Sequence, residues 1–145
     1  MKNMVNKIYL DTNAIMDAVL SRTDSHENCK QIMHSFYNHT LRGIVSTQTL
    51  VDLSYLLRKD YTVNELKNLI IELCTILTVT DVNRDIIVRA AKTHDISAYE
   101  AAVQYACAVH AGADALITSN VRDFCACKMP VLTPAEAVAR FIDNR

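Results

Sequence analysis

Short apolar runs alternate along the chain with longer segments of helical periodicity. Five runs have the length and composition of buried strands: 7–10, 44–46, 75–80, 115–118 and 129–132. The segments between them place apolar residues three and four positions apart, as amphipathic helices do. No turn signal joins two strands directly, and this order favours parallel strands. The pattern predicts an α/β fold with three layers, α/β/α, around a mostly parallel sheet of four to five short strands.

The predicted helices have recognisable ends. Their ranges are 11–20, 26–39, 47–59, 62–73, 83–93 (or from 81), 98–111 and 134–142. Thr62 with Glu65 and Thr133 with Glu136 have the spacing of a capping box, in which each side chain bonds the backbone N–H at the other end of the box. Ser97 and Glu100 have the same spacing. Gly112 stands where a glycine commonly ends a helix.

The composition is that of a compact domain without linkers. The chain has 145 residues, of which 50% are hydrophobic, with only 2 Gly and 2 Pro. We therefore expect a single domain over residues 1–145. No run reaches the ~18 apolar residues of a membrane span, and the first residues do not resemble a secretion signal. The expectation is a cytoplasmic protein with no membrane association.

The cysteines agree with a reducing compartment. There are five, an odd number. Cys29 and Cys107 lie on apolar helical stripes, so we expect them to be buried free thiols. Cys125 and Cys127 are close in sequence but lack partners at the spacing of a zinc site.

The charge balance limits how the protein could bind nucleic acid. With 15 basic and 16 acidic residues the net charge is -1. Binding along the phosphate backbone without sequence preference requires a broad basic surface. Any nucleic-acid site on this chain must therefore be local.

Acidic residues occur where predicted strands or loops meet helices. Asp11 ends the first strand, and Asp52, Glu100 and Asp123 occupy similar places later in the chain. Since parallel strands end at one edge of the sheet, these residues are expected to converge there. Each also has a simpler explanation: Asp11 can cap a helix, and Glu100 can complete the capping box of Ser97. Asp52 can be an exposed surface residue, and Asp123 can pair with Arg122 or cap a local turn.

Several carboxylates in one place require a counter-charge. Like charges raise one another's pKa, and a divalent cation relieves the repulsion. A ligand set made of oxygen atoms, without histidine or thiol, suits Mg²⁺ or Mn²⁺ better than zinc. The acidic residues therefore predict a magnesium or manganese site.

The same segments resemble the PIN-domain ribonucleases. Residues 8–17 (IYLDTNAIMD) are similar to the family's opening motif, and 45–53 (VSTQTLVDL) to its second acidic segment. Residues 95–102 (DISAYEAA) and 112–124 (GADALITSNVRDF) are similar to the third and fourth, and 131–136 to the closing strand and helix. The fourth segment is the most specific. The resemblance covers almost the whole chain.

The resemblance implies a metal-dependent endoribonuclease of single-stranded RNA. Its acidic, catalytic residues would be Asp11, Asp52, Glu100 and Asp123, and Asn120 would join Asp11, Glu100 and Asp123 as metal ligands. Three further groups would orient these side chains or bound water: Asn13, Thr118 and Asp17. Asp17 is as readily a solvated helix residue. Local cations such as Arg58, Lys59 and Arg122 would track the RNA backbone.

Two positions depart from the family's pattern. The family usually has Glu at the position of Asp52 and Asp at that of Glu100. A methylene group moves a carboxylate by ~1 Å, enough to cost ~100-fold in rate. This leaves open an alternative, a catalytically weak or inactive PIN domain that binds RNA or protein.

The family also implies partners. Many members are toxins of toxin-antitoxin pairs of the VapC kind, so a small antitoxin protein is expected. A homodimer is also expected, for which the apolar stripes of 26–39 and 62–73 offer surfaces, although core packing is their ordinary use. An enzyme that forms an aspartyl-phosphate on Asp11 is disfavoured, because Asn13 stands where that chemistry requires a second Asp.

Overall fold

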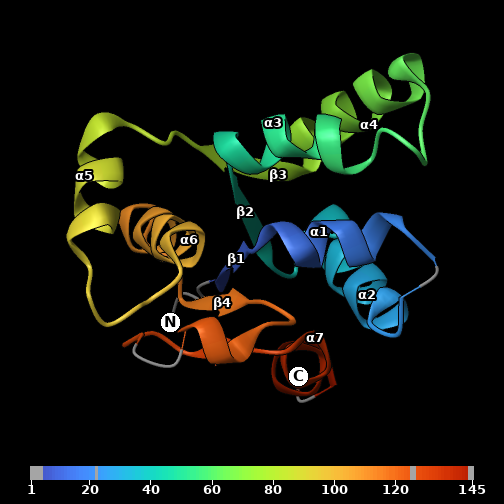
Figure 1. Ribbon diagram of the computed structural model, residues 1–145. Helices are drawn as coiled ribbons and strands as arrows, with labels where there is room; N and C mark the ends of the chain where they lie inside the picture. Colours follow the sequence, from blue (N-terminus) through green and yellow to red (C-terminus); the bar gives the residue numbers. More distant parts are fainter. Residues whose placement is uncertain (1–4, 22, 125–126, 144–145) are drawn as a thin grey trace.

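The computed structural model describes residues 5–21, 23–124 and 127–143. Within them the chain forms a five-stranded parallel sheet with the strand order β3-β2-β1-β4-β5 (Figure 1). The strands are β1 (Lys7–Leu10), β2 (Arg42–Ser46), β3 (Leu77–Thr80), β4 (Ala115–Ile117) and β5 (Val131–Leu132). The predicted α/β fold with a parallel sheet is confirmed.

Helices cover both faces of this sheet. They are α1 (Thr12–Val19), α2 (His26–Tyr37), α3 (Thr47–Leu56), α4 (Val63–Ile76), α5 (Arg84–Lys92), α6 (Tyr99–His110) and α7 (Pro134–Ala137). A 3-10 turn, η1 (Val121–Phe124), follows β4, and a π-helical segment, η2 (Val138–Asp143), continues α7. Helices α5 and α6 lie on one side of the sheet, and α1, α2 and α7 lie on the other (Figure 1).

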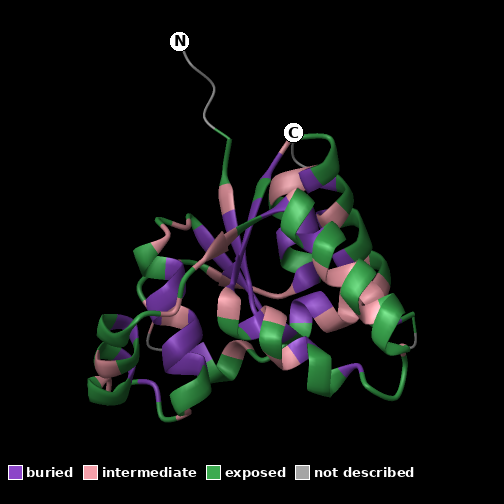
Figure 2. Cartoon of the chain, turned by 90° about the horizontal axis from the view of Figure 1, so that it is seen from above, coloured by how far each residue is buried: buried purple, intermediate pink, exposed green. Residues whose placement is uncertain are grey.

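The alternation of side chains along β1 explains the two cores. Tyr9 is paired in register with Ile44 and with Leu116, and all three pack against α5 and α6. Ile8 and Leu10 point the opposite way, into the core beneath α1 and α2. The central strands are therefore buried on both faces, as Figure 2 shows. A strand buried on both faces needs a continuous apolar run, which is the pattern that predicted it.

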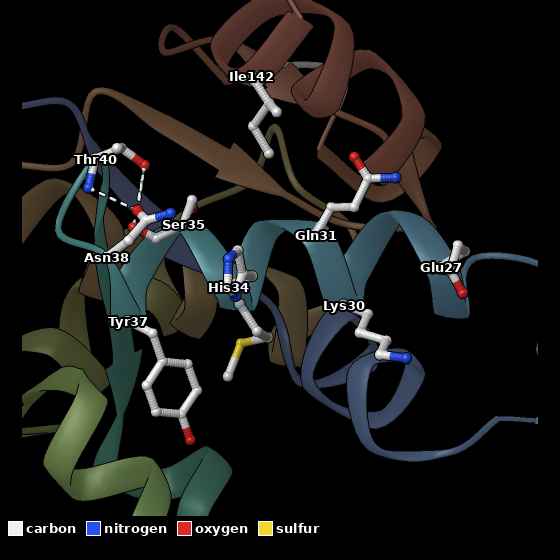
Figure 3. Close-up of a pocket in the computed structure, with 10 residues that line it drawn as sticks. Glu27, Lys30, Gln31, His34, Ser35, Tyr37, Asn38, Thr40 and Ile142 are labelled. Atoms are coloured by element: carbon white, nitrogen blue, oxygen red, sulfur yellow. Dashed lines mark hydrogen bonds between the residues drawn. The ribbon is translucent and has the colours of Figure 1, made fainter.

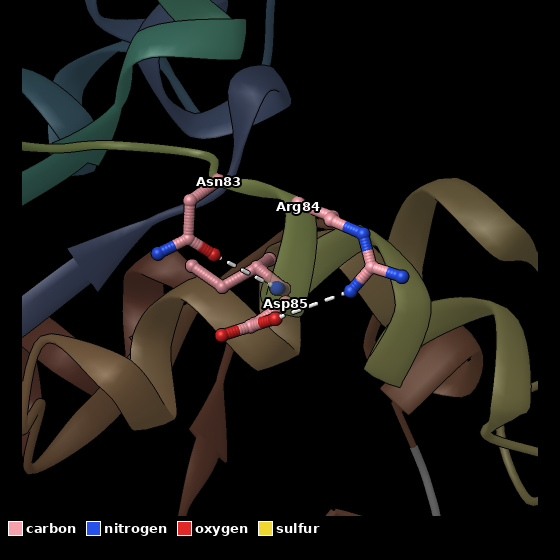
Figure 4. A network of polar contacts seen from close by, with 4 residues as sticks. Asn83, Arg84 and Asp85 are labelled. Carbon is pink, nitrogen blue, oxygen red and sulfur yellow. Dashed lines mark hydrogen bonds and ion pairs between the residues drawn. The ribbon is translucent and has the colours of Figure 1, made fainter.

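Local side-chain bonds fix most helix starts as predicted. Thr62 and Glu65 form the reciprocal capping box of α4, with bonds of 2.8 and 3.2 Å, and Thr133 and Glu136 do the same for α7. Asn83 caps α5 by accepting from the backbone N–H of Ile86 at 2.9 Å (Figure 4).

The prediction of a capping box at Ser97 was wrong. Helix α6 begins at Tyr99, its N-cap is Ala98, and the cap makes no side-chain hydrogen bond. Ser97 lies one residue too early to close the box. Glu100 therefore sits in the first turn of α6 without a capping role.

The boundary between α4 and β3 also differs from the prediction. Residues 75–80 read as a strand because they are rich in β-branched side chains, but α4 continues to Ile76. The hydroxyl of Thr75 donates to the carbonyl of Ile71 at 2.9 Å, a bond made inside helices. Packing of the apolar stripe of α4 outweighs the weak preference of these β-branched residues for a strand.

Gly43 in β2 is required by packing. A Cβ built at this position would lie 2.5 Å from atoms of both Phe36 and Leu77. Its absence lets the Phe36 ring of α2 lie against the strand. Among the described residues, no helix is both long and apolar enough to cross a membrane.

Candidate active site

The candidate site lies where the order of the strands reverses. The chain runs outward from β1 to β2 and β3, then returns to place β4 on the other side of β1. The loops that leave β1 and β4 diverge at this point, and they open a crevice in which α/β proteins commonly bind ligands. Asp11 follows β1, and the segment from Thr118 to Asp123 follows β4.

Asp11 is held at the centre of the crevice. It is buried and it is the N-cap residue of α1. One carboxylate oxygen accepts from the backbone N–H of Thr12 at 2.7 Å, and the other accepts from the hydroxyl of Thr118, also at 2.7 Å. Thr118 in turn accepts from the backbone N–H of Asn120 at 3.0 Å. Capping and a role in the site are therefore compatible for Asp11.

Three of the predicted acidic residues line one small pocket. The pocket has a volume of about 100 Å³. Its lining comes from α1, α6 and the segment after β4: Asp11, Asn13, Ala98, Glu100, Ala101, Gln104, Asn120, Asp123 and Phe124. We call this hollow the acidic pocket. Asn13 and Asn120 add amide oxygens to its three carboxylates.

The environment of Asp11 disfavours its ionised form. Burial raises the pKa of Asp11 above its ordinary value of 3.8, and the negative charges of Glu100 and Asp123 raise it further. The hydrogen bonds from Thr118 and Thr12 lower it and partly offset these effects. The acidic pocket thus has an excess of negative charge, which a cation would neutralise.

The donor set fits a hard divalent cation that keeps part of its water shell. In the described part of the chain, no three His, Cys, Asp or Glu side chains lie close enough together to enclose an ion by themselves. Mg²⁺ usually binds through one or two carboxylates and retains several waters. The pocket offers carboxylate and amide oxygens from Asp11, Glu100, Asp123 and Asn120, so these residues fit such an ion.

Asp52 lies outside the acidic pocket. It lines an adjoining hollow of about 360 Å³ between α3, α5 and α6, which we call the second pocket. Its lining consists of Gln48, Asp52, Ile87, Tyr99, Glu100, Val103 and Gln104. The amide of Gln48 donates to the Asp52 carboxylate at 2.8 Å. Glu100 and Gln104 line both pockets and form the boundary between them.

The remaining predicted residues differ in their distance from the acidic pocket. Asp17 does not line it but accepts from the hydroxyl of Ser119 at 3.0 Å, which links α1 to the loop after β4. Arg122 is exposed in η1, next to Asp123. Arg58 and Lys59 follow the carboxyl end of α3, far along the helix from its amino end at the sheet, and the Arg58 guanidinium lies 3.8 Å from the Tyr55 ring centre.

A buried polar network behind the acidic pocket was not found from the sequence. The Tyr9 hydroxyl donates to the side-chain oxygen of Gln104, and the Gln104 amide donates to the hydroxyls of Thr12 at 2.9 Å and Thr49 at 3.2 Å. Thr12 and Thr49 also bond each other at 2.8 Å. The signal available was a lone glutamine on the most apolar helix, four residues after Glu100.

A hollow larger than either of these pockets lies away from the predicted acidic residues. A hollow of about 490 Å³ lies along α2, lined among others by His34, Tyr37 and Ile142 (Figure 3). It holds one acidic residue, Glu27, and its other lining residues supply no further carboxylate. A metal site requires converging oxygen ligands rather than volume, so the acidic pocket is the better candidate.

Comparison with known proteins agrees with this geometry. A family model described as PIN domain matches residues 7–122. The chain belongs to the PIN-domain family. The match includes three of the four predicted acidic residues, Asp11, Asp52 and Glu100, and it ends one residue before the fourth, Asp123. No curated protein sequence matches the chain.

Solved structures share the fold at low sequence identity. VapBC2 from Rickettsia felis, bound to a DNA fragment from its promoter, has a TM-score of 0.65 and 16% identity, covering 88% of this chain and 98% of that one. A toxin-antitoxin complex from Klebsiella pneumoniae has a TM-score of 0.65 and 22% identity, with coverage of 88% and 97%. VapC20 from Mycobacterium tuberculosis, a toxin that cleaves the sarcin-ricin loop, has a TM-score of 0.59 and 16% identity, with coverage of 75% and 86%. The fold is thus that of VapC-like PIN domains.

Proposed function

We propose that this PIN domain is a metal-dependent endoribonuclease that hydrolyses phosphodiester bonds of single-stranded RNA. The observation that supports it best is the acidic pocket, which Asp11, Glu100 and Asp123 line at the carboxyl edge of the sheet. The proposal is also supported by the family and by the similar fold of a toxin that cleaves an RNA loop.

In this proposal the residues have distinct roles. Asp11, Glu100 and Asp123, with Asn120, would hold Mg²⁺ or Mn²⁺, which would polarise the scissile phosphate and lower the pKa of a water molecule. Thr118 and the backbone of Thr12 fix the Asp11 carboxylate through the bonds described above. Asn13 lies at the exposed rim of the acidic pocket, where it can position RNA or water.

Asp52 and Asp17 act from outside the acidic pocket. Asp52 adds a fourth carboxylate from the second pocket, next to the Glu100 that both pockets share. Asp17 holds the loop after β4 through Ser119, and the Asn120 ligand is the next residue in this loop.

The basic residues predicted to contact RNA lie at different distances from the acidic pocket. Arg122 lies beside Asp123, and we propose that it contacts the backbone at the reacting phosphate. Arg58 and Lys59 would meet the strand only further along, at the end of α3. Arg84, at the start of α5, is 85% exposed and pairs weakly with Asp85 at 3.6 Å (Figure 4), so it is a further candidate.

The test is cleavage of mixed single-stranded RNA by the purified protein with Mg²⁺, with Mn²⁺ and with chelator. We expect cleavage that requires a divalent ion and that Asp11→Asn abolishes. The matched control is Asp114→Asn, because Asp114 lies before β4 at the opposite edge of the sheet, where its carboxylate accepts from the Lys7 backbone N–H at 2.8 Å. Equal loss in both variants, or cleavage that survives chelation, would contradict the proposal.

A catalytically weak PIN domain is the second candidate. Two observations favour it. Asp52 lies outside the acidic pocket, and the family usually has the longer Glu at the position of Asp52 and the shorter Asp at the position of Glu100. Glu100→Asp and Asp52→Glu restore the usual lengths. If the double variant cleaves RNA much faster than the parent, the natural chain is the weakened form. An active parent and a slower double variant would exclude this candidate.

We also propose a toxin role with an antitoxin partner. The support is that several proteins of the same fold were solved as toxin-antitoxin complexes. Growth should slow when the chain is expressed alone and recover when a neighbouring gene product is co-expressed. We propose that the protein acts in the cytoplasm. We also propose a homodimer, from the family alone, and light scattering of the purified protein tests it.

A further inference from the structure

The second pocket has walls of the kind that hold a flat aromatic ligand. Tyr99 is the first residue of α6, and it is 52% exposed. Ile87 reaches the same hollow from α5 and is 38% exposed. Val103 lies one turn after Tyr99 on α6 and completes the apolar side. Exposed aromatic rings beside aliphatic surface are the platforms on which nucleobases stack.

The polar side of this pocket consists mainly of hydrogen-bond acceptors. Asp52 and Glu100 contribute carboxylates. The Gln48 amide already donates to Asp52, and both N–H groups of Gln104 are engaged by buried threonines. A ligand that fits must therefore supply donors. Among the bases, guanine presents a ring N–H and an amino group on one edge, adenine and cytosine present an amino group, and uracil presents a single ring N–H.

The second pocket adjoins the acidic pocket. Glu100 and Gln104 line both, so the two hollows share one wall. A strand with a phosphate at the acidic pocket would therefore have a neighbouring base at the second pocket. The surplus of negative charge there excludes a phosphate from the same place, since no cation lines the second pocket within the described residues.

We propose that the second pocket binds one nucleobase of the RNA strand, next to the phosphate that is cleaved. The base stacks on Tyr99, and its donor edge meets Asp52, so bases with an amino group are preferred over uracil and guanine is bound best. The proposal rests on the proposed ribonuclease function and specifies the substrate of that same site.

Nucleotide binding tests the base site without any cleavage. Guanosine, inosine and uridine, and their monophosphates with Mg²⁺, are titrated into the protein while NMR shifts of Tyr99 and of the Ile87 methyl groups are followed. We expect guanosine to bind more tightly than inosine, which lacks the amino group, and uridine to bind most weakly. Shifts caused only by the phosphate-bearing compounds, and the same for every base, would overturn the base site.

Three variants place the site on Tyr99. Removing a stacking ring typically costs ~1–3 kcal/mol per base, so Tyr99→Ala should weaken guanosine binding by roughly 5- to 150-fold. Tyr99→Phe keeps the ring and should keep most of the affinity. The control is Tyr37→Ala, because Tyr37 is similarly exposed, at 48%, but lies in α2 outside both pockets. Equal effects of Tyr99→Ala and Tyr37→Ala would overturn the proposal.

Cleavage kinetics separate this proposal from the one it rests on. On RNAs with a single guanine in a uracil background, we expect cleavage next to the guanine and a raised KM in Tyr99→Ala. Cleavage without base preference and an unchanged KM would overturn the base site and leave the nuclease intact. Guanosine binding at Tyr99 with no cleavage of any RNA would contradict the nuclease and leave the base site in place.

Discussion

Removal of the Gln104 side chain should reveal how much the buried polar network contributes to the fold. Gln104→Leu keeps the volume of the side chain roughly constant but deletes its bonds to Tyr9, Thr12 and Thr49. The two threonine hydroxyls still bond each other at 2.8 Å, so neither is left without a partner. The group that loses its partner is the hydroxyl of Tyr9, whose side chain is fully buried.

The expected cost follows from that one hydroxyl. A buried donor left without a partner costs ~1–3 kcal/mol. Burial raises the pKa of the Tyr9 hydroxyl, and Ser46 lies near enough to that hydroxyl to lower its pKa in part. Since Ser46 can replace Gln104 in part, we expect about 1–2 kcal/mol, or a fall in Tm of roughly 3–8 °C for a domain of this size.

A double-mutant cycle is the assay. Free energies of unfolding in urea are measured for the parent, Gln104→Leu, Tyr9→Phe and the double variant. Tyr9→Phe leaves the side-chain oxygen of Gln104 unpaired and should cost a similar amount, whereas the double variant removes both members of the bond. We expect the double variant to lose about 1 kcal/mol less than the sum of the single variants. Additive losses would refute the claim that this bond links β1 to α6.

Three further predictions concern single side chains. The pKa of Asp11 is raised in the folded protein, so its contribution to metal-free stability is present at low pH and is lost as the pH rises through the folded pKa. Asp11→Asn should flatten this pH dependence of Tm, measured by thermal unfolding from pH 3 to 8. Glu100→Gln should weaken Mn²⁺ binding by more than tenfold in calorimetry, whereas Ser97→Ala should be silent there and in metal-free Tm, since no Ser97 cap exists. Gly43→Ala should destabilise the fold by ~1–3 kcal/mol in urea unfolding, because the added methyl group meets Phe36 and Leu77; an unchanged midpoint would contradict that packing.

The fold was predictable because most of its signals are local and agree with one another. The apolar run of β1 and the capping residues Thr62 and Thr133 act over a few positions, and the structure keeps all of them. The errors arose where a local signal competed with packing. Ser97 offered a plausible cap, yet the docking of α6 on Tyr9 and Leu116 fixes the start of that helix one residue later.

The candidate site was predictable only in part. Asp11, Asp52, Glu100 and Asp123 were grouped because parallel strands and their helices share an edge, yet Asp52 lies in the second pocket rather than with the other three. The division into two pockets depends on side chains from α3, α5 and α6 that are distant in sequence. Tyr99 and Ile87 are ordinary helix residues until these helices are packed together, so the aromatic wall had no signal in the sequence. The boundary had only a weak one, the lone Gln104 on an apolar helix.

Parallel measurement of metal binding and RNA cleavage on one preparation tests the central claim most directly. Mn²⁺ is titrated into the protein, and bound ion and the initial rate of cleavage are followed in the same samples, for the parent and for Asp11→Asn. If the acidic pocket is the catalytic metal site, the binding and rate curves of the parent rise together, and the variant loses both while remaining folded. Cleavage by Asp11→Asn at the parent's rate, or a rate independent of bound Mn²⁺, would contradict the account.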